Sequence, residues 1–272
     1  MAAAAVEVHG ESGETRAAEA WPPGSVVRDI TRGGVAGLIA GVVVAGVGGR
    51  IAMRLAAIAV PGAVGEFTEN GNRIGAITLG GSLGLIVGAG LVVGFGAGFV
   101  WVTVRPWIPG GTKTRALLAM PIAVALGSLG LIDADNHDFE VLERQPVVVG
   151  ILVVLVMLVG LAIALVDAWL DRRLPHVSSL ESRPAGVYSV VTVLGLLIGL
   201  PLVVPAYFGQ EQVRLGIALV VVGVATLATW LYRVRRLETP PVVAAFGYGG
   251  LAVAVVIGLA LTWSEISFAL RI

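Results

Sequence analysis

The sequence predicts an all-α integral membrane protein, a bundle of seven transmembrane helices, or of six if the third apolar segment does not cross. The first observation is composition: 57% of residues are hydrophobic, 13% are charged and the mean hydropathy is +0.92. Such values are typical of chains that lie mostly within a bilayer. The second observation is a series of seven apolar stretches separated by short loops, which are alternately arginine-rich and acidic. None alternates with period two, as lipid-facing barrel strands do.

The chain divides into three parts by composition. Residues 1–32 contain several glutamates and a Pro-Pro-Gly break, and they lack the basic start and apolar core of a secretory signal. We expect them to form a flexible cytosolic tail. Residues 33–264 form the transmembrane domain, and residues 265–272 form a short extracytoplasmic tail.

A helix needs about 20 apolar residues to cross the hydrocarbon core of a bilayer. The first two apolar segments are long enough to tilt, and the third is marginal. The expected spans are residues 33–60, 74–104, 116–132, 146–170, 188–208, 213–232 and 242–263.

Basic residues near the spans predict the orientation, because cytoplasmic loops are enriched in arginine and lysine. With the N-terminus inside, twelve lie on the inner side and four on the outer side. The inner set is Arg16, Arg28, Arg32, Arg105, Lys113, Arg115, Arg172, Arg173, Arg183, Arg233, Arg235 and Arg236; the outer set is Arg73, Arg144, Arg214 and Arg271. The C-terminus is then extracytoplasmic. Tryptophans such as Trp101 and Trp107 are expected to anchor the inner interface.

The residue composition also suggests a location. Alanine, glycine, valine and arginine are abundant and Lys113 is the only lysine, a bias associated with GC-rich bacterial genomes. We therefore expect a multi-pass protein of a bacterial plasma membrane, whose main partner is the lipid bilayer. The net charge is zero, so nucleic acid is not an expected partner.

Glycines recur at four-residue spacing in the first two spans. Stripes of small residues allow helix backbones to approach closely in lipid. Packing of span one on span two is the favoured interpretation, while a homodimer seam or a docking face for another membrane protein are alternatives. The stripes are Gly33, Gly37, Gly41, Ala45 and Gly49, then Gly80, Gly84 and Gly88, and Gly90, Gly94 and Gly98.

Several chemistries lack the residues that they require. The chain has no cysteine, so disulfides, thiolate zinc sites and thiol nucleophiles are excluded. A retinal Schiff base needs a lysine within a membrane helix, whereas Lys113 lies in a loop. Neither a phosphate-binding loop motif nor an HExxH motif occurs. We expect no cofactor, and an enzyme is the less favoured class.

Two arginines lie where the sidedness of basic residues disfavours them. Arg50 and Arg54 are one turn apart near the outer end of span one, and a polar loop with Glu66, Glu69 and Arg73 follows. In one interpretation the arginines reach lipid phosphates or pair with the glutamates. In the other they form the cationic floor of an outward-open pocket for an anionic group.

An acidic loop at residues 133–140 is the second candidate site. Asp133, Asp135 and His137 could hold a divalent metal, but the segment lacks the glycine and the final glutamate of a calcium-binding EF-hand loop. A solvated acidic loop is the favoured alternative. At the inner end of span four, Asp167 and Asp171 are expected to form an interfacial ion pair.

The run Arg50-Ile51-Ala52-Met53-Arg54-Leu55, followed by Phe67-Thr68-Glu69-Asn70-Gly71, Ile74-Gly75 and Thr78-Leu79-Gly80, resembles a pattern in uncharacterised multi-pass membrane proteins of actinobacteria. The resemblance covers roughly the first two spans. It implies a fold and a lineage, and it assigns no activity and no catalytic residue.

From these patterns we expect a membrane protein that binds or passes a small anionic or lipid-like ligand from the outer side. Arg50 and Arg54 would bind the ligand, with Glu66, Glu69 and Arg73 nearby. The alternative is a structural or accessory subunit that docks a membrane-protein partner, or a second copy of itself, through its glycine-rich helix faces.

Overall fold

In the computed structural model, all the regular elements of the described residues are helices, and no strand occurs among those residues. The all-helical fold class is confirmed. The described residues are 22–68, 73–76, 78–128, 131–132, 137–143, 145–177, 179–208 and 212–270.

Two long helices come first, and each contains a π-helical stretch. The first is continuous from Pro23 to Ala59, and the second extends from Leu79 to Trp107. The first comprises α1 (Pro23–Ala40), η1 (Gly41–Gly48) and α2 (Gly49–Ala59), and a short turn η2 (Pro61–Ala63) follows it. The second comprises α3 (Leu79–Leu83), η3 (Gly84–Ala89), α4 (Gly90–Val104) and η4 (Arg105–Trp107).

Six more helices follow in the part of the chain that the structure describes. They are α5 (Thr112–Gly127), α6 (His137–Val141), α7 (Pro146–Arg173), α8 (Arg183–Phe208), α9 (Val213–Val234) and α10 (Pro241–Leu270). Large apolar side chains on these helices remain exposed, among them Leu197 (66%) and Val256 (67%). Exposed apolar rows of this kind are expected where lipid covers a helix.

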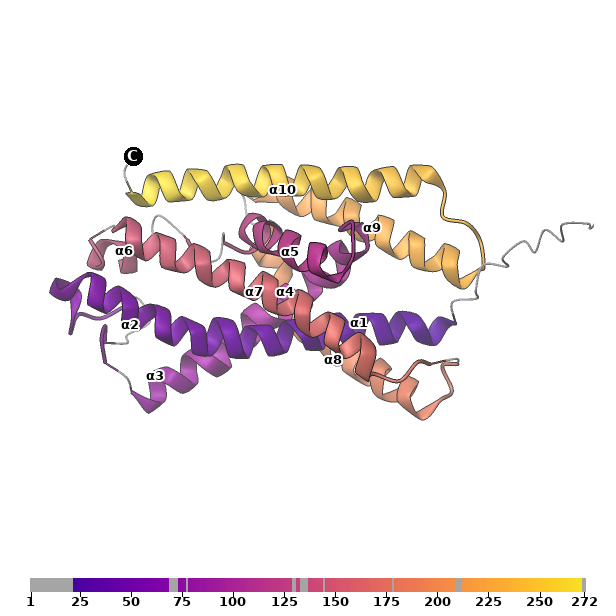
Figure 1. Cartoon of the computed structure of the whole chain (residues 1–272), viewed down its shortest axis with the longest axis horizontal. Coiled ribbons are helices and arrows are strands. Elements are labelled where there is room, and N and C mark those ends of the chain that lie inside the picture. The colour runs from indigo at the N-terminus through magenta and orange to yellow at the C-terminus, as the bar shows by residue number, and fades with distance from the viewer. Residues whose placement is uncertain are drawn as a thin grey trace, which may run out of the picture.

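Six of the described helices are long and apolar enough to cross a membrane, so the expected count of seven is not confirmed and the alternative of six fits. The third expected span corresponds to α5, which has 16 residues and a length of about 24 Å, short of the roughly 30 Å hydrocarbon core. Helix α5 ends at Gly127, and the next residue, Ser128, shares a 2.6 Å hydrogen bond with Thr262 on α10. A short helix can therefore be held between α7 and α10 by packing (Figure 1).

Several connections between helices lie at the two ends of the bundle, as Figure 1 shows. The start of α1, the α7–α8 connection and the α9–α10 connection lie at one end. The α2–α3 connection, α6 and the end of α10 lie at the other. The first turns of α1 and the last turns of α10 therefore lie at opposite ends of the bundle, and the end that faces the cytoplasm is a proposal.

The glycine stripes bring α1 and α4 into backbone contact. A Cβ atom at Gly37 would overlap the backbone of Gly98, and one at Gly41 would overlap the backbone of Gly94. Close approach of two backbones therefore requires glycine at these positions. The favoured interpretation, packing of span one on span two within the chain, describes this contact. By contrast, a Cβ atom at Gly80, Gly84 or Gly88 would meet no other atom within 4 Å among the described residues.

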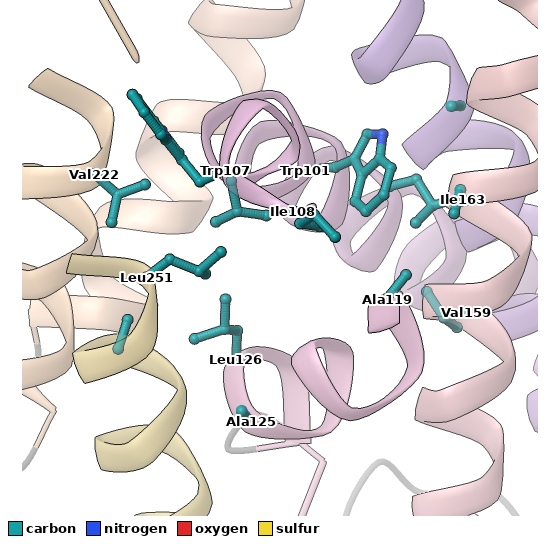
Figure 2. Packing of buried hydrophobic residues seen from close by; sticks show 14 of the residues in the cluster. Trp101, Trp107, Ile108, Ala119, Ala125, Leu126, Val159, Ile163, Val222 and Leu251 are labelled. Carbon is teal, nitrogen blue, oxygen red and sulfur yellow. The ribbon is translucent and has the colours of Figure 1, made fainter. Parts of the chain in front are cut away.

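Several aromatic rings expected at the inner interface are instead buried. Trp101 and Trp107 are each 4% exposed. The indole nitrogen of Trp107 donates a 2.8 Å hydrogen bond to Thr226, and its ring packs edge-on against Tyr248. Figure 2 shows both tryptophans within the core that α4, α5, α7, α9 and α10 surround. The anchoring prediction was wrong for these two rings, because helix packing encloses them.

The absence of native cysteines allows a direct test of sidedness. Val64→Cys and Glu238→Cys place single thiols at exposed positions. Val64 follows α2 and Glu238 lies between α9 and α10, two connections that Figure 1 shows at opposite ends of the bundle. We expect an impermeant thiol reagent added to intact cells to label the first variant only. Labelling of Glu238→Cys alone would reverse the proposed orientation.

Candidate functional site

A cavity of about 890 Å³ lies within the bundle, at the upper end of the usual range for ligand pockets. Its walls come mainly from α2, α4, α5, α7 and α8 and from the residues that follow α2, with η1, η3 and α6 contributing one or two residues each. Most of the lining is aliphatic. The polar side chains that line it are Arg50, Arg54, Thr68, Arg73, Asp138, Tyr207 and Gln212.

Three arginines, Arg50, Arg54 and Arg73, form the cationic end of the cavity. Arg50 donates from Nε to Ser82 Oγ at 3.1 Å and from Nη2 to the Thr78 carbonyl at 3.4 Å. Arg54 donates from Nη1 to the Gly75 carbonyl at 2.6 Å. These neutral acceptors orient the guanidinium groups but do not neutralise their positive charge.

The third arginine, Arg73, lies beside the ring of Phe67, with its Cζ atom 5.3 Å from the ring centroid. Arg54 and Arg73 are both exposed, which makes this end of the cavity accessible. No ion pair joins any of the three arginines to a carboxylate within the described part of the chain. Among the described residues that line the cavity, Asp138 is the one acidic residue against three arginines.

The structure brings some of the predicted site residues together at the cavity and leaves others away from it. It brings Arg50, Arg54 and Arg73 together at the cavity, whereas Glu66 is exposed and does not line it. Glu69 lies outside the described residues. The predicted pairing of the two helix arginines with Glu66 does not occur.

The predicted metal site is described only at His137. This side chain is exposed at the start of α6, and its Nδ1 lies 3.6 Å from Glu140 Oε2. Asp133 and Asp135 lie outside the described residues, so the metal hypothesis stays a prediction. Within the ranges that the structure describes, no three acidic or histidine side chains are grouped to hold a metal. The neighbouring Asp138 lines the cavity instead.

The apolar part of the cavity extends far from its cationic end. Along α7 the lining runs from Val148, which packs near the end of α2, to Ile163. Along α4 it reaches Trp101 and Val104. The pyrrole edge of the Trp101 indole lies near Gly33 on α1, and its buried Nε1 has no hydrogen-bond partner among the residues described.

A cluster of six charged side chains, which we call the ion cluster, begins on α7 one helical turn beyond Ile163. Its members come from α1, η4 and α7, and their formal charges sum to zero. They are Arg28, Asp29, Arg32, Arg105, Asp167 and Asp171.

Asp167 is the centre of the ion cluster. Its Oδ1 accepts hydrogen bonds from Arg32 Nε at 2.9 Å and from Arg105 Nη1 at 2.8 Å. Arg105 also reaches Asp29 Oδ2 at 2.5 Å. The side chains of Arg105 and Asp167 are 5% and 8% exposed, so each depends on its protein partners in place of water.

Asp171 is the most exposed member of the ion cluster, and its side chain is half-exposed. Arg28 donates to its Oδ1 at 3.0 Å and to its backbone carbonyl at 2.7 Å, and Arg32 also pairs with it. Ion pairing of Asp167 and Asp171, which the sequence predicts, is confirmed; the partners are arginines of α1 and η4, and they enclose Asp167 inside the bundle.

The sequence contains a signal for this cluster. Arg28 and Arg32 are spaced i, i+4 at one helix end, and Asp167 and Asp171 have the same spacing at another. Two complementary charged faces at the same end of a bundle predict that the faces meet.

No protein-family model, curated protein or solved structure matches this chain.

Proposed function

We propose that this chain is a plasma-membrane protein that binds a small anionic or lipid-like ligand, which enters the cavity from the outer side. The anionic group binds at Arg50, Arg54 and Arg73. The observation that supports the proposal is the cavity itself: it combines an accessible end with three guanidinium groups and a long apolar interior. Arginine favours anionic oxygens because its planar fork donates paired hydrogen bonds.

The hydrogen bonds of the arginines favour binding over a purely structural role. Arg50 and Arg54 use part of their donor capacity on the Ser82 hydroxyl and on backbone carbonyls. An arginine has five N–H donors, so further donors remain for a ligand. Two fixed guanidinium groups one turn apart present these donors without reorganisation.

Binding is favoured over passage in this conformation. The cavity ends at Trp101, Val104 and Ile163, and the ion cluster lies beyond them. Passage to the other side would require the arginine–aspartate contacts between α1, η4 and α7 to separate. A binding protein needs no such step.

Removal of either helix arginine should weaken anion binding. In nanodiscs of phosphatidylcholine, we expect Arg50→Ala and Arg54→Ala each to reduce the affinity for dodecyl phosphate by about tenfold or more, since a hydrogen bond to a charged group contributes about 1.5–3 kcal/mol. Calorimetric titration measures the effect. Arg214→Ala is the matched control, because Arg214 is an exposed arginine at the start of α9 that does not line the cavity.

Membrane insertion and the elution profile of both variants should match those of the parent protein. Equal affinity in the parent and in both cavity variants would overturn the proposal. Binding of neither dodecyl phosphate nor inorganic phosphate by the parent protein would also contradict it.

The alternative is a structural or accessory subunit. One observation favours it: no atom of the described residues lies within 4 Å of a Cβ at glycines 80, 84 and 88, unlike the stripe that packs α4 on α1. Such a face suits close approach of a helix from a partner or a second copy. If the cavity binds no anion and Gly84→Leu disrupts a complex isolated from membranes, this alternative is the better one.

A further inference from the structure

We infer that the ligand is an anionic amphiphile, whose charged head group binds at the cationic end of the cavity and whose alkyl tail extends along the apolar interior to Trp101. This inference rests on the proposed anion-binding function and names the chemical class of the ligand.

The depth of the cavity supports a tail. From Val148 to Ile163, fifteen residue steps of α7 line it, which at about 1.5 Å per residue is a depth of about 22 Å. Half of a bilayer's hydrocarbon core, the depth of one leaflet's acyl chains, is about 15 Å. The cavity can therefore accept a whole tail, whereas an inorganic anion would occupy its cationic end alone.

The chemistry of the walls supports the same ligand. Beyond the arginines, α4 contributes Val93, Ala97 and Val100, and α7 contributes Ile151 and Leu155. These side chains offer no hydrogen bond to a polar solute. A hydrophilic ligand that filled the cavity would lose its hydration without compensation, whereas an alkyl chain loses nothing when it moves there from lipid.

Contact between the tail and Trp101 is the decisive readout. The bilayer already dissolves an alkyl chain, so affinity measured from the membrane reports mainly on the head group. Bromine quenches tryptophan fluorescence on contact, and Trp101 is 4% exposed, which shields it from bulk lipid. The probe is ω-bromododecyl phosphate in phosphatidylcholine nanodiscs. Trp101→Phe provides the reference that subtracts quenching of lipid-facing tryptophans such as Trp169 and Trp263.

We expect ω-bromododecyl phosphate to quench most of the Trp101 emission. The alcohol ω-bromododecanol, which lacks the charge, should reach the same quenching only at a concentration about tenfold higher or more. Ala97→Phe places a ring in the cavity one turn from Trp101. It should abolish this quenching, whereas a ring added on the same helix outside the cavity should not. Leu91→Phe is the control, because Leu91 lies on the same helix outside the cavity lining.

Two failures are distinguishable. If Arg50→Ala and Arg54→Ala weaken the binding of butyl phosphate but the brominated tail never quenches Trp101, the amphiphile inference is wrong and the anion-binding function stands. If quenching of Trp101 is equal for the phosphate and the alcohol, and both arginine variants bind butyl phosphate like the parent, the proposed function fails as well.

Discussion

Asp167→Asn is expected to destabilise the folded bundle by about 3–5 kcal/mol, the usual consequence of removing one partner from a buried ion pair. The asparagine keeps the shape of the side chain but loses the negative charge that Arg32 and Arg105 share. Those two guanidinium groups would then be buried with insufficient compensation. Equilibrium unfolding in mixed detergent micelles, followed by circular dichroism, measures the change in the free energy of unfolding.

The matched control is Asp171→Asn, four residues along the same helix. Asp171 also pairs with two arginines, but its side chain is 50% exposed and water can replace the lost charge. We expect it to lose less than half as much stability as the Asp167 variant. Equal losses would mean that burial does not determine the strength of the cluster.

Charge balance within the ion cluster can be tested separately. Asp167→Asn combined with Arg32→Gln restores a net charge of zero among the remaining members. We expect the double variant to be more stable than the sum of the two single losses predicts, by about 1 kcal/mol or more. Strict additivity would show that the two side chains do not interact.

The sequence located most of the helices because hydropathy and proline mark their ends. Helix α7 begins at Pro146 and α9 begins at Val213, where the apolar runs begin. The first helix begins at Pro23, ten residues before its expected span. Its first turns contain Arg28, Asp29 and Arg32, which resemble a solvated tail in sequence but are paired inside the bundle.

The two candidate sites differ in how far the sequence could predict them. Arg50 and Arg54 could be singled out because basic residues are usually on the cytoplasmic side, and these two lie near the opposite end of their span. Their position along one helix is enough to show this. The ion cluster depends on the relative register of α1, η4 and α7, which packing determines. Neither the span lengths nor the loop charges determine this register. Hydropathy therefore could not predict which arginines pair with Asp167.

The contact between α1 and α4 determines whether the cavity walls can form, and its glycines should tolerate no larger residue. Gly37→Val is expected to abolish the folded bundle or to shift α1 from α4, because even a Cβ there would overlap the backbone of Gly98 and would lie 2.5 Å from the Gly94 carbonyl oxygen. A backbone cannot move aside as a flexible side chain does, so the loss should exceed the roughly 1–3 kcal/mol of ordinary overpacking. The yield of monodisperse protein and its free energy of unfolding measure the effect.

Gly34→Val is the control on the same helix, since a Cβ at Gly34 meets no atom of the described residues within 4 Å. Both variants add the same side chain and the same helix propensity, so any difference between them reports on the α1–α4 contact alone. We expect Gly34→Val to remain folded and to keep its phosphate binding. If Gly37→Val is as stable as Gly34→Val, the glycine stripe does not hold α1 on α4, and a seam between two copies becomes the better account of these glycines.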